Sequence, residues 1–305
     1  MSTKNTATST SDNLGKNQGT LYIVATPIGN LGDITQRALD TLRKVDKICA
    51  EDTRNTRKLL THFGISGDLQ ALHDHNEKNR VEQVKSWLDA GENIAVVSDA
   101  GTPLISDPGY HLVSELGGDG SCDGNGVYNI EPIPGASAII TALSIAGLPT
   151  DRFSFEGFLP AKPVGRNKVL QANLHETRTQ VYYESSHRIS VTIKAMLDIY
   201  GADRKVVLAR ELTKLYEQVF RGNLAELAAW IDADPMHQKG EFVLMLDGHE
   251  EQTDDDAIQQ SSEDLLKILL DELPVKQAAS IASKITGRKK NELYKQAMEI
   301  KKDKD

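Results

Sequence analysis

The sequence predicts an α/β protein with two α/β domains and a small helical module after them. Apolar, strand-like runs alternate with helical stripes from Thr20 to about Ile133, a pattern typical of βαβ units and a largely parallel sheet. Five apolar runs along the chain end in turns that are either polar or rich in Gly and Pro. An acidic, Gln-rich stretch from about His249 to Asp264 then precedes a basic C-terminal segment.

Length and composition limit the possible classes of protein. The 305 residues allow two domains and a further module, and the content of 39% hydrophobic and 26% charged residues is ordinary for a globular protein. Cys49 and Cys122 lack metal-binding spacing, so we expect a reducing, cytoplasmic location without disulfides. No apolar stretch approaches about 18 residues, so no membrane partner is expected. Residues 1–19, rich in Ser, Thr and Asn, are expected to be a disordered tail.

The first α/β domain is assigned to residues 20–133. Helical stripes are expected at 34–45 and 81–88, where apolar residues recur at helical spacing. The glycine-rich run from about 117 to 126 is expected to be a surface loop. The expected strands are Leu21–Ala25, Lys47–Ala50, Ile94–Val97 and Val127–Glu131.

The second α/β domain is assigned to residues 134–248. Its first segment, Ala136–Ala146, is apolar nearly all round, which predicts a buried helix. Tyr216–Phe220 and Glu241–Leu246 are expected to be paired strands, so the sheet should be mixed rather than all parallel. Further strands are expected near Val181, Val206 and Phe242.

The C-terminal segment is divided into an acidic linker, 249–262, and a basic helical module, 263–305. Three short helices are expected at Leu265–Leu273, Val275–Ile285 and Asn291–Ile300, with apolar stripes that include Ile281 and Ile285. From Lys276 onward the chain contains nine basic and four acidic residues, although the whole chain has a net charge of −9. Such a module can carry a nucleic-acid surface, with Arg288, Lys289 and Lys290 projecting together, or it can be a solvated face.

Three of the strand-end turns offer groups for a small-molecule site, because ligands of open α/β sheets lie outside the carboxyl ends of the strands. Thr26–Asn30 has a rigid Pro and a Gly that permits close approach of a ligand, whereas Pro134–Ala138 offers backbone N–H groups at a helix start. Asp99, in Ser98–Pro103, could bind a ribose hydroxyl or an amino group, or cap a helix. Gly-x-Gly-x-x-Gly, Walker and Gly-x-Ser-x-Gly patterns are absent from the sequence.

Two histidine-containing segments suggest other chemistry. Alternate residues of His73–His75 could share a strand face, but the segment is loop-like and no third ligand is evident, so no metal is expected. His187 could act as a base or satisfy a local hydrogen bond.

Taken together, the motifs resemble the tetrapyrrole methylase superfamily, and more closely its ribosomal RNA branch. That branch is the bacterial small-subunit ribosomal RNA methyltransferase I family of cytidine 2′-O-ribose methyltransferases. The resemblance covers nearly all of residues 20–247 and the basic C-terminal helices, although the glycine-rich loop is longer than expected and Ala136 replaces a frequent Pro. The segments that carry it are Leu21–Leu31, Ala50–Arg54, Val97–Gly109, Pro134–Ala138, Asp151–Phe153, Glu156–Pro160, Tyr183–Arg188 and Ala209–Lys214.

The resemblance implies that S-adenosylmethionine binds in a cleft between the two α/β domains and that small-subunit ribosomal RNA is the substrate. It also implies a homodimer, for which the apolar helix at 136–146 offers surface. By position, Pro27 and Gly29 shape one wall and Asp99 holds polar groups of the methionine or ribose. The other implied cofactor residues are Ala100, Gly101, Thr102, Leu104, Ser137, Ala138 and, on the adenine side, Tyr183, Leu212 and Gly240.

Transfer of a methyl group to a ribose hydroxyl requires an in-line approach and removal of a proton. Glu184 and His187 are the first candidates for the base because they flank the expected cleft. Asp52 with Arg54 could equally form a structural ion pair or face the RNA. The further candidate bases are Glu51, Asp52 and Glu211.

Two alternatives remain open at this stage. One is a C-methyltransferase of tetrapyrroles, with the same fold and cofactor, which the 50–54 segment and the basic tail disfavour. The other is a non-catalytic RNA-binding assembly factor, which the intact cofactor-loop residues disfavour.

Overall fold

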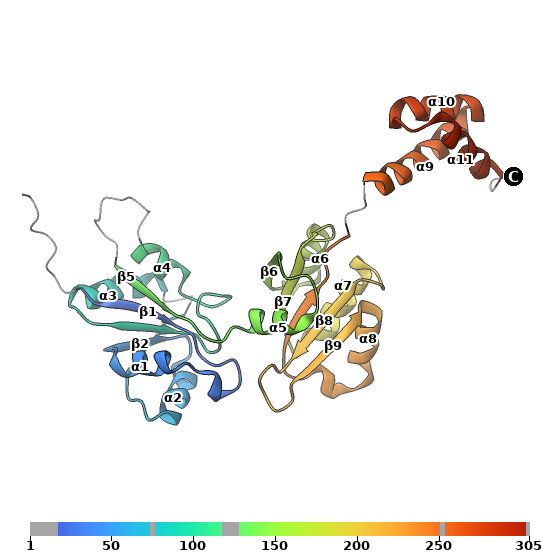
Figure 1. Cartoon of the computed structure of the whole chain (residues 1–305). Coiled ribbons are helices and arrows are strands. Elements are labelled where there is room, and N and C mark those ends of the chain that lie inside the picture. The colour runs from blue at the N-terminus through green and yellow to red at the C-terminus, as the bar shows by residue number, and fades with distance from the viewer. Residues whose placement is uncertain (1–17, 74–76, 118–127, 251–253, 303–305) are drawn as a thin grey trace, which may run out of the picture. The chain divides into compact units, whose positions relative to one another are not determined.

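A computed structural model describes residues 18–73, 77–117, 128–250 and 254–302 (Figure 1). The chain divides into two compact units, Met1–Gly248 and His249–Asp305. Cys122, the glycine-rich loop, Asp74, His75 and the expected N-terminal tail up to residue 17 lie outside the described residues.

The first unit begins with a parallel sheet, as the alternating pattern predicted. The strands follow the order β3-β2-β4-β1-β5, and each neighbouring pair is parallel. Their bounds are β1 Thr20–Val24, β2 Lys47–Ala50, β3 Asp68–Ala71, β4 Ile94–Val97 and β5 Asn129–Ile133. The short edge strand β3 was not expected, because its polar sequence has no apolar run to bury.

Helices cover both faces of this sheet. They are α1 Gln36–Lys44, α2 Thr53–His62, α3 Glu77–Asp89 and α4 Tyr110–Gly117, with a 3₁₀ turn, η1, at Leu31–Asp33. Leu42 and Leu60, from α1 and α2, pack with Ile48 on one face. Leu88 and Leu112, from α3 and α4, form a second buried cluster on the other face. The side chains of Thr35 and Asp52 cap α1 and α2.

The second sheet is mixed, as predicted, with the order β6-β7-β10-β8-β9. Its strands are β6 Phe153–Phe158, β7 Thr179–Ser185, β8 Lys205–Arg210, β9 Gln218–Asn223 and β10 Glu241–Leu246. Only the pair β6–β7 is parallel among the pairings of these described strands. The expected pairing of β9 with β10 is wrong. β9 forms a hairpin with β8, and β10 returns through a helix to insert between β7 and β8.

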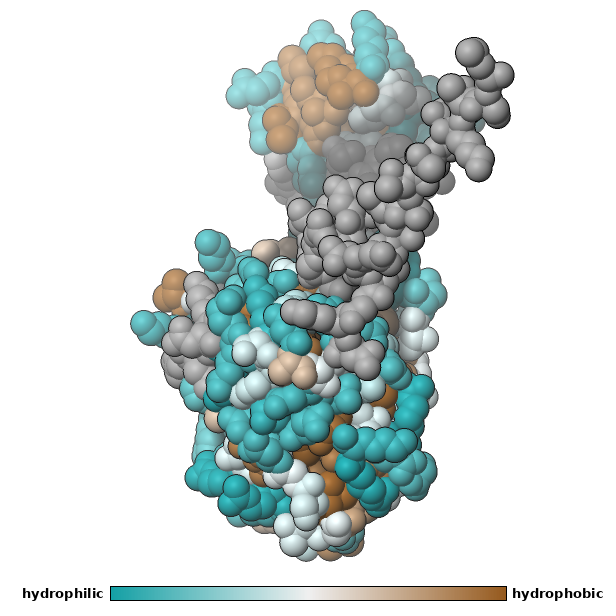
Figure 2. Space-filling model, turned by 90° about the vertical axis from the view of Figure 1, so that its left-hand side faces the viewer, coloured by the Kyte–Doolittle hydropathy of each residue, from teal (hydrophilic) through white to brown (hydrophobic). Residues whose placement is uncertain are grey.

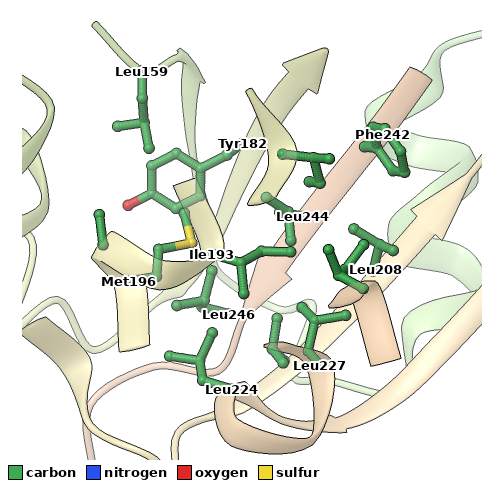
Figure 3. Close-up of a cluster of buried hydrophobic side chains, with 14 of the residues drawn as sticks. Leu159, Tyr182, Ile193, Met196, Leu208, Leu224, Leu227, Phe242, Leu244 and Leu246 are labelled. Atoms are coloured by element: carbon green, nitrogen blue, oxygen red, sulfur yellow. The ribbon is translucent and has the colours of Figure 1, made fainter. Parts of the chain in front are cut away.

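Four helices accompany this sheet: α5 Ala138–Ala146, α6 Pro163–Ala172, α7 Ile189–Tyr200 and α8 Leu224–Ala233, followed by the 3₁₀ turn η2 at Pro235–Gln238. Tyr182, Ile193, Leu227 and other buried side chains join the sheet to α6, α7 and α8 (Figure 3). On the opposite face, α5 packs in a cluster that also contains Ile28 from the first half. The prediction that α5 is wholly buried is wrong, because Ile140 and Ile145 are 57% and 37% exposed.

The second unit consists of α9 Asp254–Glu272, α10 Val275–Thr286 and α11 Lys290–Lys302. The α9 helix begins inside the segment that was expected to be a linker. Gly287, with a φ of 73°, ends α10 as predicted. Ala279 and Ala282 supply the α10 part of the core, so the expected burial of Ile281 and Ile285 is wrong. Figure 2 shows hydrophobic residues gathered on this unit. Within the described residues, no helix is both long and apolar enough to cross a membrane.

Candidate functional site

The first unit has a cavity of about 480 Å³ at the carboxyl ends of strands from both sheets. This volume lies within the range of small-molecule sites. Eleven of its lining residues come from the first sheet's turns and the start of α5: Ile28, Glu51, Asp99, Ala100, Gly101, Thr102, Ile105, Ser106, Asp107, Ser137 and Ala138. The second sheet contributes Phe158, Tyr183, Glu184, Ser185, Ser186, Ala209, Leu212, Gly240, Glu241, Phe242 and Val243.

The three turns singled out from the sequence are joined to one another. Thr26 and Gly101 exchange two backbone hydrogen bonds, with N···O distances of 2.9 and 3.1 Å. The Thr102 hydroxyl donates to the Ala136 carbonyl oxygen at 3.1 Å. A Cβ atom on Gly135 would lie 2.9 Å from the Cβ of Ala25, so only Gly permits this approach of the first and third turns. One wall of the cavity is therefore a connected backbone framework.

The loop that follows β4 has an unusual backbone. Leu104 and Ser106 have φ values of 75° and 68°, and Gly101 and Gly109 have 82° and 120°. A non-glycine residue in this region costs about 1–3 kcal/mol, and such strain persists where the surroundings enforce it, often at functional sites. The loop bends so that Asp99, Ile105 and Asp107 all line the cavity.

Carboxylates dominate the charge of the cavity. Its acidic lining residues are Glu51, Asp99, Asp107, Glu184 and Glu241, and none of its lining residues is Lys, Arg or His within the part of the chain that the structure describes. Burial, followed by repulsion from Glu51 and Asp99, raises the pKa of Asp107 to about 6, although a hydrogen bond from Ser98 opposes this. The cavity is therefore suited to a cationic ligand.

The opposite wall is apolar and partly aromatic. The ring of Tyr183 lies 4.9 Å from that of Phe155 and 5.5 Å from that of Phe158, measured between ring centroids. Burial raises the pKa of Tyr183 to about 12, so its hydroxyl stays protonated at neutral pH. At Gly240, with φ of 108°, a Cβ atom would lie 2.6 Å from Cγ of Glu211, which leaves no room for a side chain. A flat ring could lie against this wall.

The N-terminus of α5 supplies polar groups at a third side. Ser137 is the N-cap residue of α5, and its side chain makes no capping hydrogen bond. Ser137 and Ala138 both line the cavity. The positive end of the helix dipole and the first N–H groups of α5 favour a carboxylate in this position.

The structure separates the predicted bases. Glu184, 2% exposed, accepts hydrogen bonds from Ser185 N at 2.8 Å, Arg188 Nε at 2.8 Å and the Thr192 hydroxyl at 2.6 Å. Its side chain is thereby fully occupied, although it lines the cavity. His187 is exposed in the next turn and does not line the cavity.

Asp52 and Glu211 also make ion pairs rather than lining the cavity. Hydrogen bonds from the side chain and the backbone N–H of Arg54 lower the pKa of Asp52 to about 2, and its N-cap contact anchors α2. Burial of Glu211 opposes a lower pKa, but its ion pair with Lys214, at 2.9 Å, and the Glu241 N–H lower it on balance. Glu51 lines the cavity, and one of its oxygens accepts from Asp99 N at 3.4 Å.

The cofactor residues implied by the resemblance fall into three groups. Asp99, Ala100, Gly101, Thr102, Ser137, Ala138, Tyr183, Leu212 and Gly240 line the main cavity. Pro27 and Gly29 instead line a second, adjoining hollow of about 330 Å³. Leu104 lines neither, and its side chain lies beside Gly109. The second hollow also contains Asn55, Lys58 and Lys214, and shares Asp99 with the first.

Eleven of the lining residues were not among the site residues predicted from the sequence, and Asp107, Phe158 and Glu241 are three of them. Asp107 follows the Ser98–Pro103 turn within the same motif, but nothing in the spacing shows that the loop folds back to the cavity. Phe158 and Glu241 end and begin strands whose order was not predictable. Among the described residues, no group of three His, Cys, Asp or Glu side chains could hold a metal ion.

The basic residues predicted to contact RNA differ in their solvent exposure and in their contacts with other side chains. Arg54 has 86% of its side chain exposed but is paired with Asp52 at 2.6 Å. Arg288 is turned toward Gln296 and Glu292 in its own unit, and its side chain is only 20% exposed. Lys289 and Lys290 are exposed at the start of α11.

Two lobes with a cavity at their strand ends, and a separate helical unit, define the class of protein. Residues 20–228 match the family model of tetrapyrrole (corrin/porphyrin) methylases, and residues 256–301 match that of the RsmI C-terminal HTH domain. The chain is 52% identical to the ribosomal RNA small subunit methyltransferase I of Escherichia coli O157:H7 over 92% of this chain and 96% of that protein. It is equally identical to the one of Vibrio cholerae serotype O1, over 92% and 94%.

The chain belongs to the tetrapyrrole methylase family, in the branch that contains these ribosomal RNA small subunit methyltransferases. The fold is also similar to that of solved proteins. The methyltransferase CobJ has a TM-score of 0.55 at 17% identity, over 77% of this chain and 96% of that one. Diphthine synthase has a TM-score of 0.54 at 16% identity, over 75% and 90%.

Proposed function

We propose that this protein transfers a methyl group from S-adenosylmethionine to the ribose 2′-hydroxyl of a cytidine in small-subunit ribosomal RNA. Relatives that are 52% identical over 92% of this chain carry the name ribosomal RNA small subunit methyltransferase I. The observation that carries the choice of cofactor is the acidic cavity, whose described lining has no basic side chain. A sulfonium and an ammonium group are favoured there, whereas a nucleotide phosphate is repelled.

The residues present fit this cofactor on structural grounds. Gly240 lines the cavity together with Tyr183 and Leu212, and this apolar surface suits the adenine ring. Asp99 and Asp107 would face the cationic groups, and the N-terminus of α5 would receive the carboxylate. When bound, the cofactor supplies an activated methyl group, and the chain supplies position and charge.

The second hollow is suited to the RNA strand. It adjoins the first cavity through Ile28, Asp99, Ala100 and Glu241, and Lys58 and Lys214 stand along it. Cationic side chains beside an otherwise acidic site attract the phosphates of a nucleotide without competing for the cofactor. This arrangement favours RNA over a tetrapyrrole as the substrate, and we place the protein in the cytoplasm with its ribosomal substrate.

The test is methylation of small-subunit RNA by the purified protein, followed by mass mapping of the modified nucleotide. A 2′-O-methylcytidine that also disappears from the RNA of cells lacking this protein supports the proposal. Methylation of a corrinoid precursor and not of RNA would instead support the tetrapyrrole alternative. Absence of S-adenosylmethionine binding in calorimetry would support a non-catalytic assembly factor.

We further propose that the helical unit holds the RNA. Its exposed Lys289 and Lys290 lie at the start of α11, and the unit has its own buried core, separate from the first unit. Deletion of residues 249–305 should weaken RNA binding and flatten its dependence on salt, because phosphate contacts release counterions. Cofactor affinity and the thermal stability of residues 1–248 should change little. Loss of cofactor binding in the truncated protein would show that the unit is structural.

A homodimer is the remaining part of the proposal. Ile140 and Ile145 leave apolar surface exposed on α5, which a second copy could bury. Light scattering at micromolar concentration should give twice the mass of the 33.5 kDa chain, and a monomer mass would refute the dimer.

A further inference from the structure

We propose that Asp107 is the group that removes the proton from the ribose 2′-hydroxyl, an inference that rests on the function proposed above. The structure selects Asp107 by its position in the cavity and by the contacts of the other acids around it. It was absent from the candidates that the sequence suggested.

Asp107 is held in place by the strained loop after β4. The residue before it, Ser106, has φ of 68°, and Gly109 after it has 120°. A Cβ atom on Gly109 would lie 3.3 Å from Cγ of Leu104, so the loop is closed on itself there. The half-buried carboxyl group lines the cavity beside Ser98, whose hydroxyl hydrogen-bonds it. A positioned rather than a mobile carboxylate is the requirement for proton removal.

The other four acids of the cavity each accept a hydrogen bond or form an ion pair within the described structure. For Glu51, the hydrogen bond comes from Asp99 N at 3.4 Å. Asp99 accepts from Asp52 N at 3.1 Å and from Asn55 Nδ2 at 2.9 Å, which anchors the start of α2. Glu184 accepts from three different residues. Glu241 is ion-paired with Lys214 at 2.7 Å. Asp107 lines the same cavity but lies on the loop after β4, away from the contacts that hold these four carboxylates.

The surroundings of Asp107 tune it for this role. Glu51 after β2, Asp99 after β4 and Tyr183 on β7 are the titratable groups that interact with it, and Glu184 and Glu241 line the same cavity. Burial and the like charges of Glu51 and Asp99 raise the pKa of Asp107 to about 6, close to neutral pH. A base is most effective when its pKa is near the working pH, and it contributes roughly 10²–10⁴-fold in rate.

The proton and charge balance of the step is complete without another reactant. The 2′-oxygen forms a bond to the methyl carbon, the carbon–sulfur bond breaks, and its electron pair remains on sulfur. The Asp107 carboxylate takes the 2′-hydroxyl proton. One positive and one negative charge are thereby removed together, so the pKa of Asp107 rises as the sulfonium charge disappears.

Cofactor binding provides a test that does not require catalysis. A cation near a carboxylate shifts its pKa by about 1–3 units, so the affinity for S-adenosylmethionine should fall at least about tenfold when Asp107 is protonated. Calorimetry from pH 5 to 8 should show affinity rising through pH 6 with the wild-type protein. The dependence should be much weaker for S-adenosylhomocysteine, whose sulfur is neutral, and should vanish in Asp107→Asn. A wild-type affinity that is flat with pH would overturn the proposal.

Catalysis provides the second test. At saturating cofactor, Asp107→Asn should lower the single-turnover rate by about 10²–10⁴-fold. The acid limb of kcat/KM for the cofactor, near pH 6 in the wild type, should disappear. The matched control is Glu51→Gln, which removes a carboxylate from the same cavity. Its acid limb should persist and move to lower pH, because a like charge near Asp107 is lost.

Several outcomes would contradict the assignment. A wild-type rate in Asp107→Asn, or loss of the acid limb in Glu51→Gln, would exclude Asp107 as the base. If Asp107→Asn folds poorly, a carboxyl-carbon NMR titration of the wild type still tests the proposal. An Asp107 pKa near 4 would refute it. Failure of the wild type to methylate RNA would instead refute the proposed function and leave the binding experiment interpretable.

Discussion

The turns after β4 and β7 look alike in sequence but differ in what their carboxylates can do. Each places an acid beside a serine at the carboxyl end of a buried strand, and each lines the cavity. At the end of β7, Glu184 has only 1% of its side chain exposed and accepts from Arg188, the N-cap residue of α7, and from Thr192 on α7. After β4, Asp99 and Asp107 sit on a loop with positive φ angles and face the cavity.

The difference shows that the availability of a carboxylate for a ligand depends on hydrogen-bond donors located elsewhere in the chain. The β7 turn leads directly into α7, so Arg188 and Thr192, one and two turns further on, reach back to Glu184. The β4 turn leads into a long loop before α4, and a hydrogen bond from Ser98 reaches Asp107. Glu184 is thus held by the start of the helix that follows it, whereas Asp107 lies in a loop at the cavity.

The largest effect is expected at Glu184. Glu184→Ala leaves Arg188 and Thr192 with unpaired groups in a buried place, and breaking such a pair costs about 3–5 kcal/mol. Urea unfolding should show this loss of stability. Glu241→Ala, on β10 opposite Ser185 and with 77% of the side chain exposed, is the control and should change stability by about 0.5 kcal/mol or less. Equal effects of the two substitutions would erase the distinction between the turns.

A smaller effect, on binding rather than stability, is expected at Asp99. Asp99→Ala should weaken S-adenosylmethionine binding about ten- to hundredfold, because a charge-assisted hydrogen bond contributes about 1.5–3 kcal/mol. The control is Asn55→Ala, which removes the amide contact at 2.9 Å but keeps the carboxylate. Calorimetry should show a much smaller loss in that variant. If both variants lose equal affinity, Asp99 acts by positioning α2 instead of by contacting the cofactor.

The sequence was sufficient where a local pattern determines structure. The bounds of β2 and β4, the parallel sheet and the stop at Gly287 all follow from apolar runs and glycine placed within a few residues. Prediction from the sequence failed where segments far apart in the chain compete for the same position in a sheet. The neighbours of β10 depend on which strand edge is free after α8 forms, and the polar edge strand β3 has no period to detect.

The site shows the same limit. The turns with Asp99 and Ser137 were found because they follow strands, and the structure joins them through Thr102. The place of Asp107 in the cavity could not be predicted, because it depends on how a loop closes. The hydrogen bonds that Glu184 accepts could not be predicted either, because they depend on which donors reach it. Ile281 and Ile285 were assigned to the wrong face of α10, since Ala279 and Ala282 satisfy the same helical spacing with smaller side chains.

Asp52 provides a third case, a saturated acid that is 25% exposed and pairs with the largely exposed Arg54, and it should give the smallest effect. Its pKa of about 2 is caused first by the Arg54 side chain and then by the Arg54 backbone N–H. In Arg54→Ala the pKa measured by NMR titration should therefore rise only part of the way toward the ordinary 3.8, because the N-cap bond remains. The stabilisation from a depressed pKa is complete above about pH 4 and is lost as the pH falls toward 2. Unfolding at neutral pH should hardly change, as expected for a solvated ion pair. A loss as large as that of Glu184→Ala would mean that exposure does not distinguish the two acids.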